Sequence, residues 1–235
     1  VVILGGTAAI SSTAENSLKT LLGAANVQRI GGTNRYETAR LVAAATVKFL
    51  DCNYKGSAFV TTGLNFPDAL AAGPLAAAKG WPIYLVGPAG LDAPTAAAMT
   101  DIGVTTALAL GSTSAVPASV ATAIGTSVGA TVTRLSGPDR YSTAVAVAGY
   151  GVANAGLSWD GITIATGENF PDGLSAGAAQ GLNGSVLLLT RTASLPAPTA
   201  SALTAHKDSI ALLRFVGSDQ AISPAVRVSV ANLLK

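Results

Sequence analysis

The sequence has little of what catalysis and metal binding most often use. It holds one cysteine and one histidine among 235 residues. An intramolecular disulfide is therefore excluded, and a His-based triad or a zinc site lacks the necessary side chains. Cys52 is expected to be a small buried or half-buried residue. No Asp-x-Asp pair occurs either. We therefore expect no catalytic residue, no bound metal ion and no cofactor.

Charges and long apolar runs are also scarce. Charged residues make up 11% of the chain and the net charge is +2. There is no Lys/Arg run and no basic patch interleaved with aromatics, so the sequence does not predict nucleic-acid binding. Apolar residues make up 49%, which is too many for a disordered chain. Gly, Pro, Thr or a charge interrupts each apolar run before it reaches about 18 residues, so we expect no transmembrane helix.

What the sequence does contain is an internal repeat. The pattern Thr-Gly-x-Asn-Phe-Pro-Asp-x-Leu occurs at 62–70 and again at 166–174. The pattern Arg-x-x-Gly-x-x-Arg-Tyr-x-Thr-Ala occurs at 29–39 and 134–144, and a glycine-containing segment recurs at 2–11, 108–117 and 214–223. The order and spacing of these segments are constant. They divide the chain into a tail of one repeat at 1–26 (a strand plus a helix) and two complete repeats at 27–129 and 130–235.

Strands and helices are predicted to alternate within each repeat. Short Val/Ile/Leu runs predict strands at 27–30, 57–61, 82–86, 105–110, 132–135, 162–165, 186–189 and 211–216. Ala-rich segments predict helices at 34–50, 66–79, 93–101, 117–124, 140–153, 170–181, 197–206 and 224–234. Such alternation is typical of an α/β fold in which each repeat forms a mainly parallel sheet flanked by helices. Right-handed crossovers then bring all strand-to-helix loops to one edge of the sheet.

The repeated patterns place polar side chains on that edge. Asp68 falls in the first turn of a helix, where the helix dipole favours a negative charge, and Arg35 opens the preceding helix. One interpretation is that the acidic and amide groups cap helices and form ion pairs with Arg35 and Arg140. The other is that they face a glycan, since ligands of open α/β sheets collect beyond the carboxyl ends of the strands. Both interpretations apply to Asn65, Asp68, Asn169 and Asp172.

Two other sets of repeated residues also have two interpretations. Arg29 and Arg134 either contact phosphate or carboxylate of a ligand or tie a loop. Tyr36 and Tyr141 either pack a helix or stack on a sugar. The apolar stretches that begin at Ile83 and Val186 are expected, from their chemistry alone, to be buried strands.

These motifs resemble the cell wall binding repeat 2 family of Gram-positive surface proteins. The resemblance rests on 29–39 and 62–72, on the Pro-Ile-Tyr-Leu-Val run at 82–86, on 5–11, and on the second copies at 134–144, 166–177, 185–189 and 217–223. It implies a Rossmann-like or Toprim-like sheet in each repeat. It also implies three tandem repeats packed as a pseudo-threefold trimer. This chain departs from that pattern because the first repeat lacks its Arg-Tyr and Asn-Phe-Pro-Asp segments, so either upstream residues or a neighbouring sheet would complete it.

The resemblance also implies a function. It implies a secreted protein held non-covalently at the cell wall or surface of a Gram-positive bacterium by an anionic wall polysaccharide. It connects polysaccharide anchoring with an aliphatic stretch, which here corresponds to Ile83, Tyr84 and Leu85 and to Val186, Leu187 and Leu188. Tyr84 departs from the aliphatic pattern. We therefore expect a non-catalytic anchoring module, and the alternatives are a structural spacer or surface-layer unit that binds no glycan and, less favoured, a cell-surface hydrolase.

Overall fold

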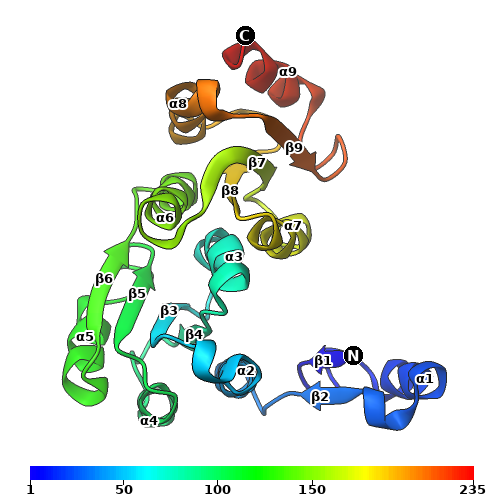
Figure 1. Ribbon diagram of the computed structural model, residues 1–235, viewed down its shortest axis with the longest axis vertical. Helices are drawn as coiled ribbons and strands as arrows, with labels where there is room; N and C mark the ends of the chain where they lie inside the picture. Colours follow the sequence, from blue (N-terminus) through cyan, green and yellow to red (C-terminus); the bar gives the residue numbers. More distant parts are fainter.

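The computed structural model describes residues 1–235 apart from the side chain of Cys52, so the expectation for Cys52 lies outside the described residues. Figure 1 shows the chain as an open arc, with the N-terminal strands at one end, a sheet with helices in the middle, and the C-terminal sheet at the other end. All strand pairs are parallel. The expected α/β fold with parallel sheets flanked by helices is thereby confirmed.

The N-terminal unit is a pair of strands with one helix. It contains β1 (Val2–Leu4), α1 (Ser12–Leu22), the short helix η1 (Ala24–Asn26) and β2 (Gln28–Ile30). The strands pair only with each other among the described strands, and α1 buries none of its residues. Because most of its apolar side chains stay in contact with solvent, this unit adds little to the core.

The central sheet has the strand order β4-β3-β5-β6. Its strands are β3 (Ser57–Thr62), β4 (Ile83–Val86), β5 (Thr106–Leu110) and β6 (Thr131–Leu135). The accompanying helices are α2 (Arg35–Leu50), η2 (Asp51–Asn53), α3 (Pro67–Lys79), α4 (Ala93–Asp101), α5 (Ala118–Ala123) and the π-helix η3 (Ile124–Val128). The first strand of the second sequence repeat, β6, thus completes the sheet of the first.

The C-terminal sheet has the order β8-β7-β9. It is built from β7 (Ser158–Thr166), β8 (Ser185–Thr190) and β9 (Leu212–Val216). The accompanying helices are α6 (Arg140–Ala155), α7 (Pro171–Leu182), α8 (Ala197–His206), η4 (Lys207–Ser209) and α9 (Pro224–Leu233). β7 begins before the predicted 162–165 and includes an irregularity between Ser158 and Ile162.

Strand β3 shows why the sequence folds into a covered sheet. Ala58 and Val60 belong to one apolar cluster, with Met99 of α4, while Phe59 between them belongs to another, with Leu75 of α3. Successive side chains of a strand point to opposite faces, so a strand covered on both faces needs a continuous apolar run. The run at 58–60 supplies it.

Helices α3 and α7 join the two repeats at the centre of the arc, where they pack together (Figure 1). Gly73 and Gly177 face each other so closely that a Cβ atom on either would lie 3.0 Å from the other's Cα. A Cβ on Gly181 would lie 2.5 Å from the Cβ of Ala77. The absence of side chains at these positions allows the helices to approach.

Candidate functional site

Each repeat joins its Arg-Tyr helix to its Asn-Phe-Pro-Asp loop in the same way. The Arg35 Nη1 atom, at the start of α2, donates to the Gly63 carbonyl at 2.6 Å, and Arg140 Nη1 of α6 donates to the Gly167 carbonyl at 2.5 Å. Both glycines directly follow the carboxyl ends of β3 and β7. The two motifs of each repeat therefore meet as predicted, but the strands that precede them lie in different sheets, and the bond is to a carbonyl.

The expected ion pairs and helix caps at the Asn-Phe-Pro-Asp loops are corrected by the structure. No ion pair among the described residues involves Asp68 or Asp172. Helices α3 and α7 begin after Phe66 and Phe170, and no side chain caps either one. The guanidinium groups of Arg35 and Arg140 donate to the carbonyls of the loop glycines instead of to the aspartates.

The helix caps lie instead at the start of the Arg-Tyr helices. Asn34 Oδ1 accepts from the Glu37 amide at 2.9 Å, and Asp139 Oδ1 accepts from the Ser142 amide at 2.8 Å. These bonds satisfy N–H groups that have no partner within the helix. The sequence signal was present, because Asn and Asp directly precede the two Arg-Tyr pairs.

The tyrosines of the Arg-Tyr pairs pack against the loop glycines. A Cβ on Gly63 would lie 2.5 Å from the Tyr36 ring, and one on Gly167 would lie 3.0 Å from the Tyr141 ring. Tyr141 is buried, and burial raises the pKa of its hydroxyl. These contacts give both tyrosines a packing role and explain why glycine follows threonine in both loops.

Arg29 and Arg134 tie backbone loops, as one of the two interpretations expected. Arg134 donates to the carbonyls of Gly111 and Val116 at 2.7 and 2.8 Å. Arg29 donates to the Gly5 carbonyl at 2.7 Å and pairs with Glu15 at the same distance. In both places the guanidinium fixes the turn that follows the neighbouring strand.

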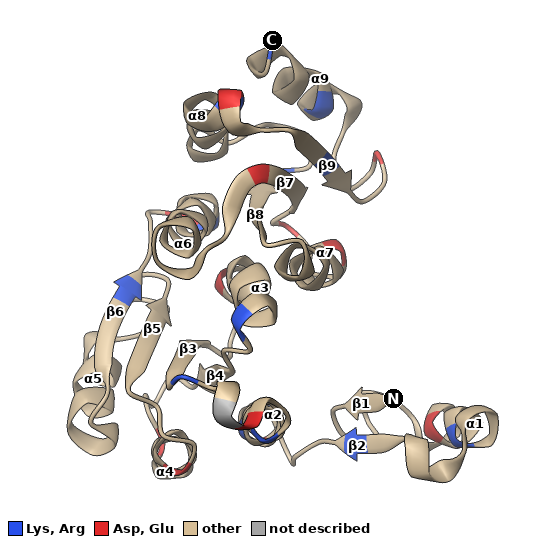
Figure 2. Ribbon diagram, in the orientation of Figure 1, with Lys and Arg blue, Asp and Glu red and all other residues tan. Residues whose placement is uncertain are grey.

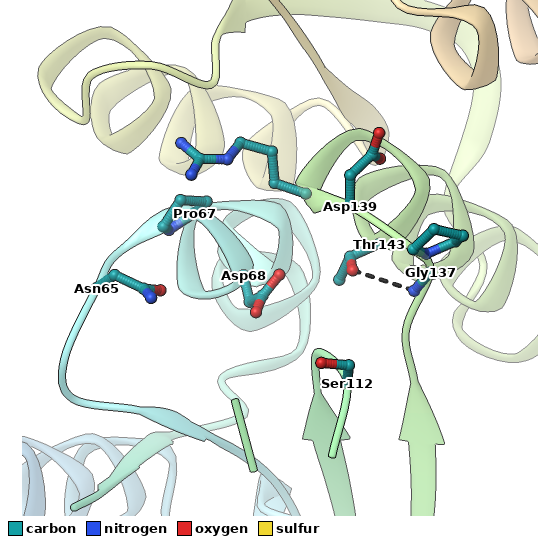
Figure 3. Close-up of a pocket in the computed structure, with 9 residues that line it drawn as sticks. Asn65, Pro67, Asp68, Ser112, Gly137, Asp139 and Thr143 are labelled. Carbon is teal, nitrogen blue, oxygen red and sulfur yellow. Dashed lines mark hydrogen bonds between the residues drawn. The ribbon is translucent and has the colours of Figure 1, made fainter. Parts of the chain in front are cut away.

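Asp68 faces the second repeat (Figure 3). Its carboxylate touches Gly111 in the turn after β5, and it shares a pocket of about 150 Å³ with Ser112, Thr143 and Arg140. Asn65, Pro67, Gly137, Pro138 and Asp139 complete the lining. Burial raises the pKa of Asp68, while the Thr143 hydroxyl and the Arg140 guanidinium act in the opposite direction. The site is thus a joint between repeats, lined by both.

The other copies of these segments lie elsewhere in the arc. Asp172 has the matching contact with Gly217, after β9. Asn169 forms a local bond, because its Oδ1 accepts from the Phe170 amide at 2.9 Å. The loops of the two repeats meet through Phe66 and Phe170, whose ring centroids lie 5.6 Å apart in an edge-to-face arrangement.

The apolar stretches occupy parallel strands, with a register that differs from their sequence match. Ile83 pairs with Phe59 and Leu187 pairs with Thr163, so Ile83 corresponds to Leu187 and Tyr84 to Leu188. Val186, Leu187, Leu188 and Tyr84 are fully buried, and the Tyr84 hydroxyl donates to the Ala98 carbonyl at 3.1 Å. Ile83 and Leu85 are partly exposed, so they alone of the six lie open to solvent.

Charge is sparse over the whole arc, and Figure 2 shows Lys and Arg interspersed with Asp and Glu. Two charged residues of the loop edge were missed by sequence reasoning, Glu168 and Arg191. They line a pocket of about 460 Å³ with Asp139, Arg140 and Tyr141. Arg191 follows Thr190, which comes directly after the strand predicted at 186–189. This position at the end of a strand could have identified Arg191 as a residue of the loop edge.

The family model of Cell wall binding domain 2 (CWB2) matches residues 29–121 and 134–227. The chain belongs to this family. Both matched segments begin at the arginines that tie the strand-end turns, Arg29 and Arg134. The two CWB2 matches thus correspond to the two sequence repeats. The sheets do not, because β6 of the second repeat pairs with β5 of the first.

Two curated proteins of Bacillus subtilis (strain 168) are similar to this CWB2 chain. N-acetylmuramoyl-L-alanine amidase LytC is 28% identical over all of this chain, which corresponds to 43% of LytC. The Amidase enhancer is 31% identical over 99% of this chain and 30% of its own length. The chain therefore spans less than half of either relative.

Two solved structures share the CWB2 fold. Cwp6 from Clostridium difficile superposes with a TM-score of 0.86 over all of this chain and 36% of its own, at 22% identity. Cwp8 from the same organism has a TM-score of 0.82 over 99% of this chain and 38% of its own, also at 22% identity. The likeness to these structures shows that the arrangement of sheets is shared.

Proposed function

We propose that the chain is a non-catalytic module that holds its parent protein at a Gram-positive cell wall by binding an anionic wall polysaccharide. The observation that carries this proposal is the joint between the repeats. There, Asn65 and Asp68 of one repeat and Asp139 and Arg140 of the next line one polar pocket at the loop edge. Membership of the CWB2 family indicates the cell wall as the place of binding.

The arrangement of the loops suits a polymer. Two repeats present equivalent loops on the same arc, and the carboxyl ends of parallel strands are where α/β folds bind ligands. Weak contacts at successive repeats add up when they engage one long ligand. A polysaccharide can occupy several such loops at once, whereas a small molecule occupies a single pocket.

The chemistry of the loop edge supports binding rather than hydrolysis. His206 is the single histidine, and its ring stacks at 4.1 Å on Trp159, near the start of β7 and so at the opposite end of the strands. Asp68 and Asp172 lie in different repeats and face different turns. Repeat symmetry accounts for the two carboxylates without a catalytic pair.

Two serines stand in the pattern Gly-x-Ser-x-Gly, at 125–129 and 173–177. In a hydrolase with a nucleophile elbow, this serine sits on a sharp turn between a strand and a helix. Ser127 instead lies within η3, and Ser175 lies within α7, where its hydroxyl donates to the Pro171 carbonyl at 3.1 Å. Neither position offers an elbow.

Wall sedimentation tests the proposal. The double variant Asn65→Ala, Ser112→Ala removes two exposed polar side chains of the joint pocket. We expect about tenfold weaker retention on purified Bacillus subtilis walls, because contacts at one of several linked sites are lost. The matched control, Asn16→Ala with Ser201→Ala, changes the same residue types on α1 and α8 and is expected to bind like the wild type.

The same assay separates the alternatives. Walls stripped of their anionic polysaccharide should retain little wild-type protein. Equal retention on stripped and intact walls would contradict the proposal. A folded wild-type chain that binds neither wall would favour the structural spacer, and release of wall fragments by this chain alone would favour a hydrolase.

A further inference from the structure

The two repeats differ at two equivalent positions on the loop edge. The register pairs Thr62 with Val86 and Thr166 with Thr190, so the next residues, Gly87 and Arg191, occupy the same place. The residues after the loop glycines also correspond. The Leu64 amide donates to Thr62 Oγ1 at 3.1 Å, and the Glu168 amide donates to Thr166 Oγ1 at 3.2 Å. Leucine and glycine in the first repeat are thus glutamate and arginine in the second.

These two changes give the second repeat a charged pocket. Arg191 lies over the Tyr141 ring, with its guanidinium carbon 5.2 Å from the ring centroid. Glu168 and Arg140 lie on the same pocket of about 460 Å³. A planar guanidinium held against an aromatic face keeps its edge N–H groups available to a ligand.

The carboxylates of this pocket are already occupied by the protein. Glu168 Oε2 accepts from the Thr192 amide at 2.9 Å, and Asp139 Oδ1 accepts from the Ser142 amide at 2.8 Å. The bonds from Thr192 lower the pKa of Glu168, so its carboxylate is ionised and holds the 190–192 turn. Both acidic groups therefore hold backbone through one oxygen, and the charges of Arg191 and Arg140 also lower the pKa of Glu168.

The guanidinium groups, by contrast, keep unused donors. Each has five N–H groups. Arg140 donates one of them to the Gly167 carbonyl, and the Arg191 guanidinium donates no hydrogen bond to any described residue. Two guanidinium groups with free donors on one open pocket match an oxyanion, because arginine binds phosphate and carboxylate through paired N–H groups.

In the first repeat, Arg35 and Leu64, the counterparts of Arg140 and Glu168, line a mostly apolar pocket instead. It measures about 630 Å³ and contains one charged side chain, Arg35, which donates to the Gly63 carbonyl. The remaining walls are mostly apolar, namely Leu64, Phe66, Ala69, Leu85, Phe170 and Leu174. With glycine at position 87, the first repeat also lacks a counterpart of the Arg191 guanidinium. The first repeat therefore serves as an internal reference for the second.

We propose that the second repeat carries an anion subsite, in which Arg191 and Arg140 hold an oxyanion of the wall polymer beside Tyr141, and that the first repeat lacks it. This inference rests on the proposed wall-polysaccharide function and names the chemical group that the second repeat recognises. The oxyanion is a phosphate diester or a sugar carboxylate. Glycerophosphoglycerol, which is a phosphate diester, and glucuronate are soluble probes of these two sources.

Titration of the 235-residue chain with each probe tests the subsite directly. We expect saturable binding of at least one probe by the wild type, and about tenfold weaker binding by Arg191→Gln, since a hydrogen bond to a charged group contributes at least this factor. The control is Arg214→Gln, which removes the same charge from an exposed arginine of β9. Its affinity should equal that of the wild type.

A gain-of-function variant sharpens the comparison of the repeats. Leu64→Glu with Gly87→Arg gives the first repeat the residues of the second, and the number of bound probe molecules should rise from one to two. Circular dichroism and a thermal melt check that each variant is folded.

Several outcomes would overturn the subsite. They are binding of neither probe, equal loss with Arg191→Gln and Arg214→Gln, or unchanged binding with Arg191→Gln. If the wild type is retained on walls while any of these occurs, the subsite is wrong and the wall-binding proposal stands. If a probe binds through Arg191 but the walls retain no protein, the wall-binding proposal fails alone.

Discussion

Asp68 and Asp172 hold the same position in the two repeats, yet they have different surroundings. Both carboxylates touch the glycine of the turn after a neighbouring strand, Gly111 or Gly217. Asp68 also shares a pocket with Thr143 and Arg140 of the following repeat. Its burial there raises its pKa.

This difference shows which contacts belong to a repeat and which belong to the joint. The contact of the aspartate with the glycine turn, like the bond of Arg35 or Arg140 to a loop carbonyl, recurs because each repeat carries all the residues that make it. The enclosure of Asp68 requires helix α6 of the next repeat beside α3. The same motif thus gains a new environment where two repeats pack together.

The largest effect is expected from breaking the packing of α3 and α7, which positions the joint. Gly181→Ala places a Cβ atom 2.5 Å from the Ala77 Cβ and 2.6 Å from the Pro74 carbonyl oxygen. We expect a loss of about 2 kcal/mol in the free energy of unfolding, because overpacking costs more than the helix propensity of alanine returns. Urea denaturation measures it.

The matched control for this prediction is Gly149→Ala in α6, where an added Cβ meets no atom within 4 Å. There, alanine should stabilise the chain by about 0.5–1 kcal/mol. An equal loss of stability in both variants would mean that glycine is needed for its backbone and not for the close approach of the helices.

A smaller effect is expected from the charge of Asp68. Because its pKa is raised above 3.8 in the folded chain, the folded state binds this proton more tightly than the unfolded state does. The resulting stability is fully present below pH 3.8 and is lost as the pH rises through the raised value. Asp68→Asn should therefore gain stability relative to the wild type over this window, by less than about 1 kcal/mol, since partly solvated charges are screened.

Thermal melts at a series of pH values measure the gain. Asp172→Asn serves as the control, because it changes the same residue type outside the joint and leaves Asp68 in place. A variant with Asp172→Asn should keep the pH dependence that Asp68 gives the wild type. If Asp68→Asn and Asp172→Asn shift the profile equally, the enclosure of Asp68 has no energetic consequence.

The smallest effect concerns the arginine that interacts with Asp68. The sequence predicted Arg35 of the same repeat, whereas the structure places Arg140 of the next repeat beside Asp68. A double-mutant cycle with Arg140→Gln and Asp68→Asn should give a coupling of about 0.5 kcal/mol at neutral pH. The cycle with Arg35→Gln and Asp68→Asn should give a value near zero, because Arg35 bonds to the Gly63 carbonyl. A larger coupling for Arg35 would restore the ion pair within the repeat.

The secondary structure was largely predictable, and the reason lies in local pattern. The Val/Ile/Leu runs and the Ala-rich segments gave nearly every element, including β5 and α4 with bounds within a residue. Phe59 between Ala58 and Val60 also shows that an uninterrupted apolar run marks a strand covered on both faces. The meeting of Arg35 with the loop after β3 was expected from a single sheet per repeat, but β2 and β3 lie in different sheets, so the packing of α2 brings the two motifs together.

The partners of the site residues were less predictable. Charge complementarity favoured an Arg–Asp pair, but the loop carbonyls accept the bonds instead. Sequence similarity matched Ile83 with Val186, but the strand pairing shows that Ile83 corresponds to Leu187, one residue later. Similarity between short apolar stretches does not fix the register of a strand. Arg191 escaped notice because it lies outside the repeated motifs, and its position over Tyr141 depends on the fold.

The sequence by itself determined the α/β alternation, the two repeats and the identity of the loops at the functional edge, because these depend on local periodicity and duplicated motifs. Only the tertiary structure decided that β6 joins the sheet of the preceding repeat and that Asp68 faces the following one. The physical reason is that parallel strands pair through backbone groups that every residue carries. The choice of neighbour is therefore made by long-range packing, such as the close approach of α3 and α7 through Gly73 and Gly177.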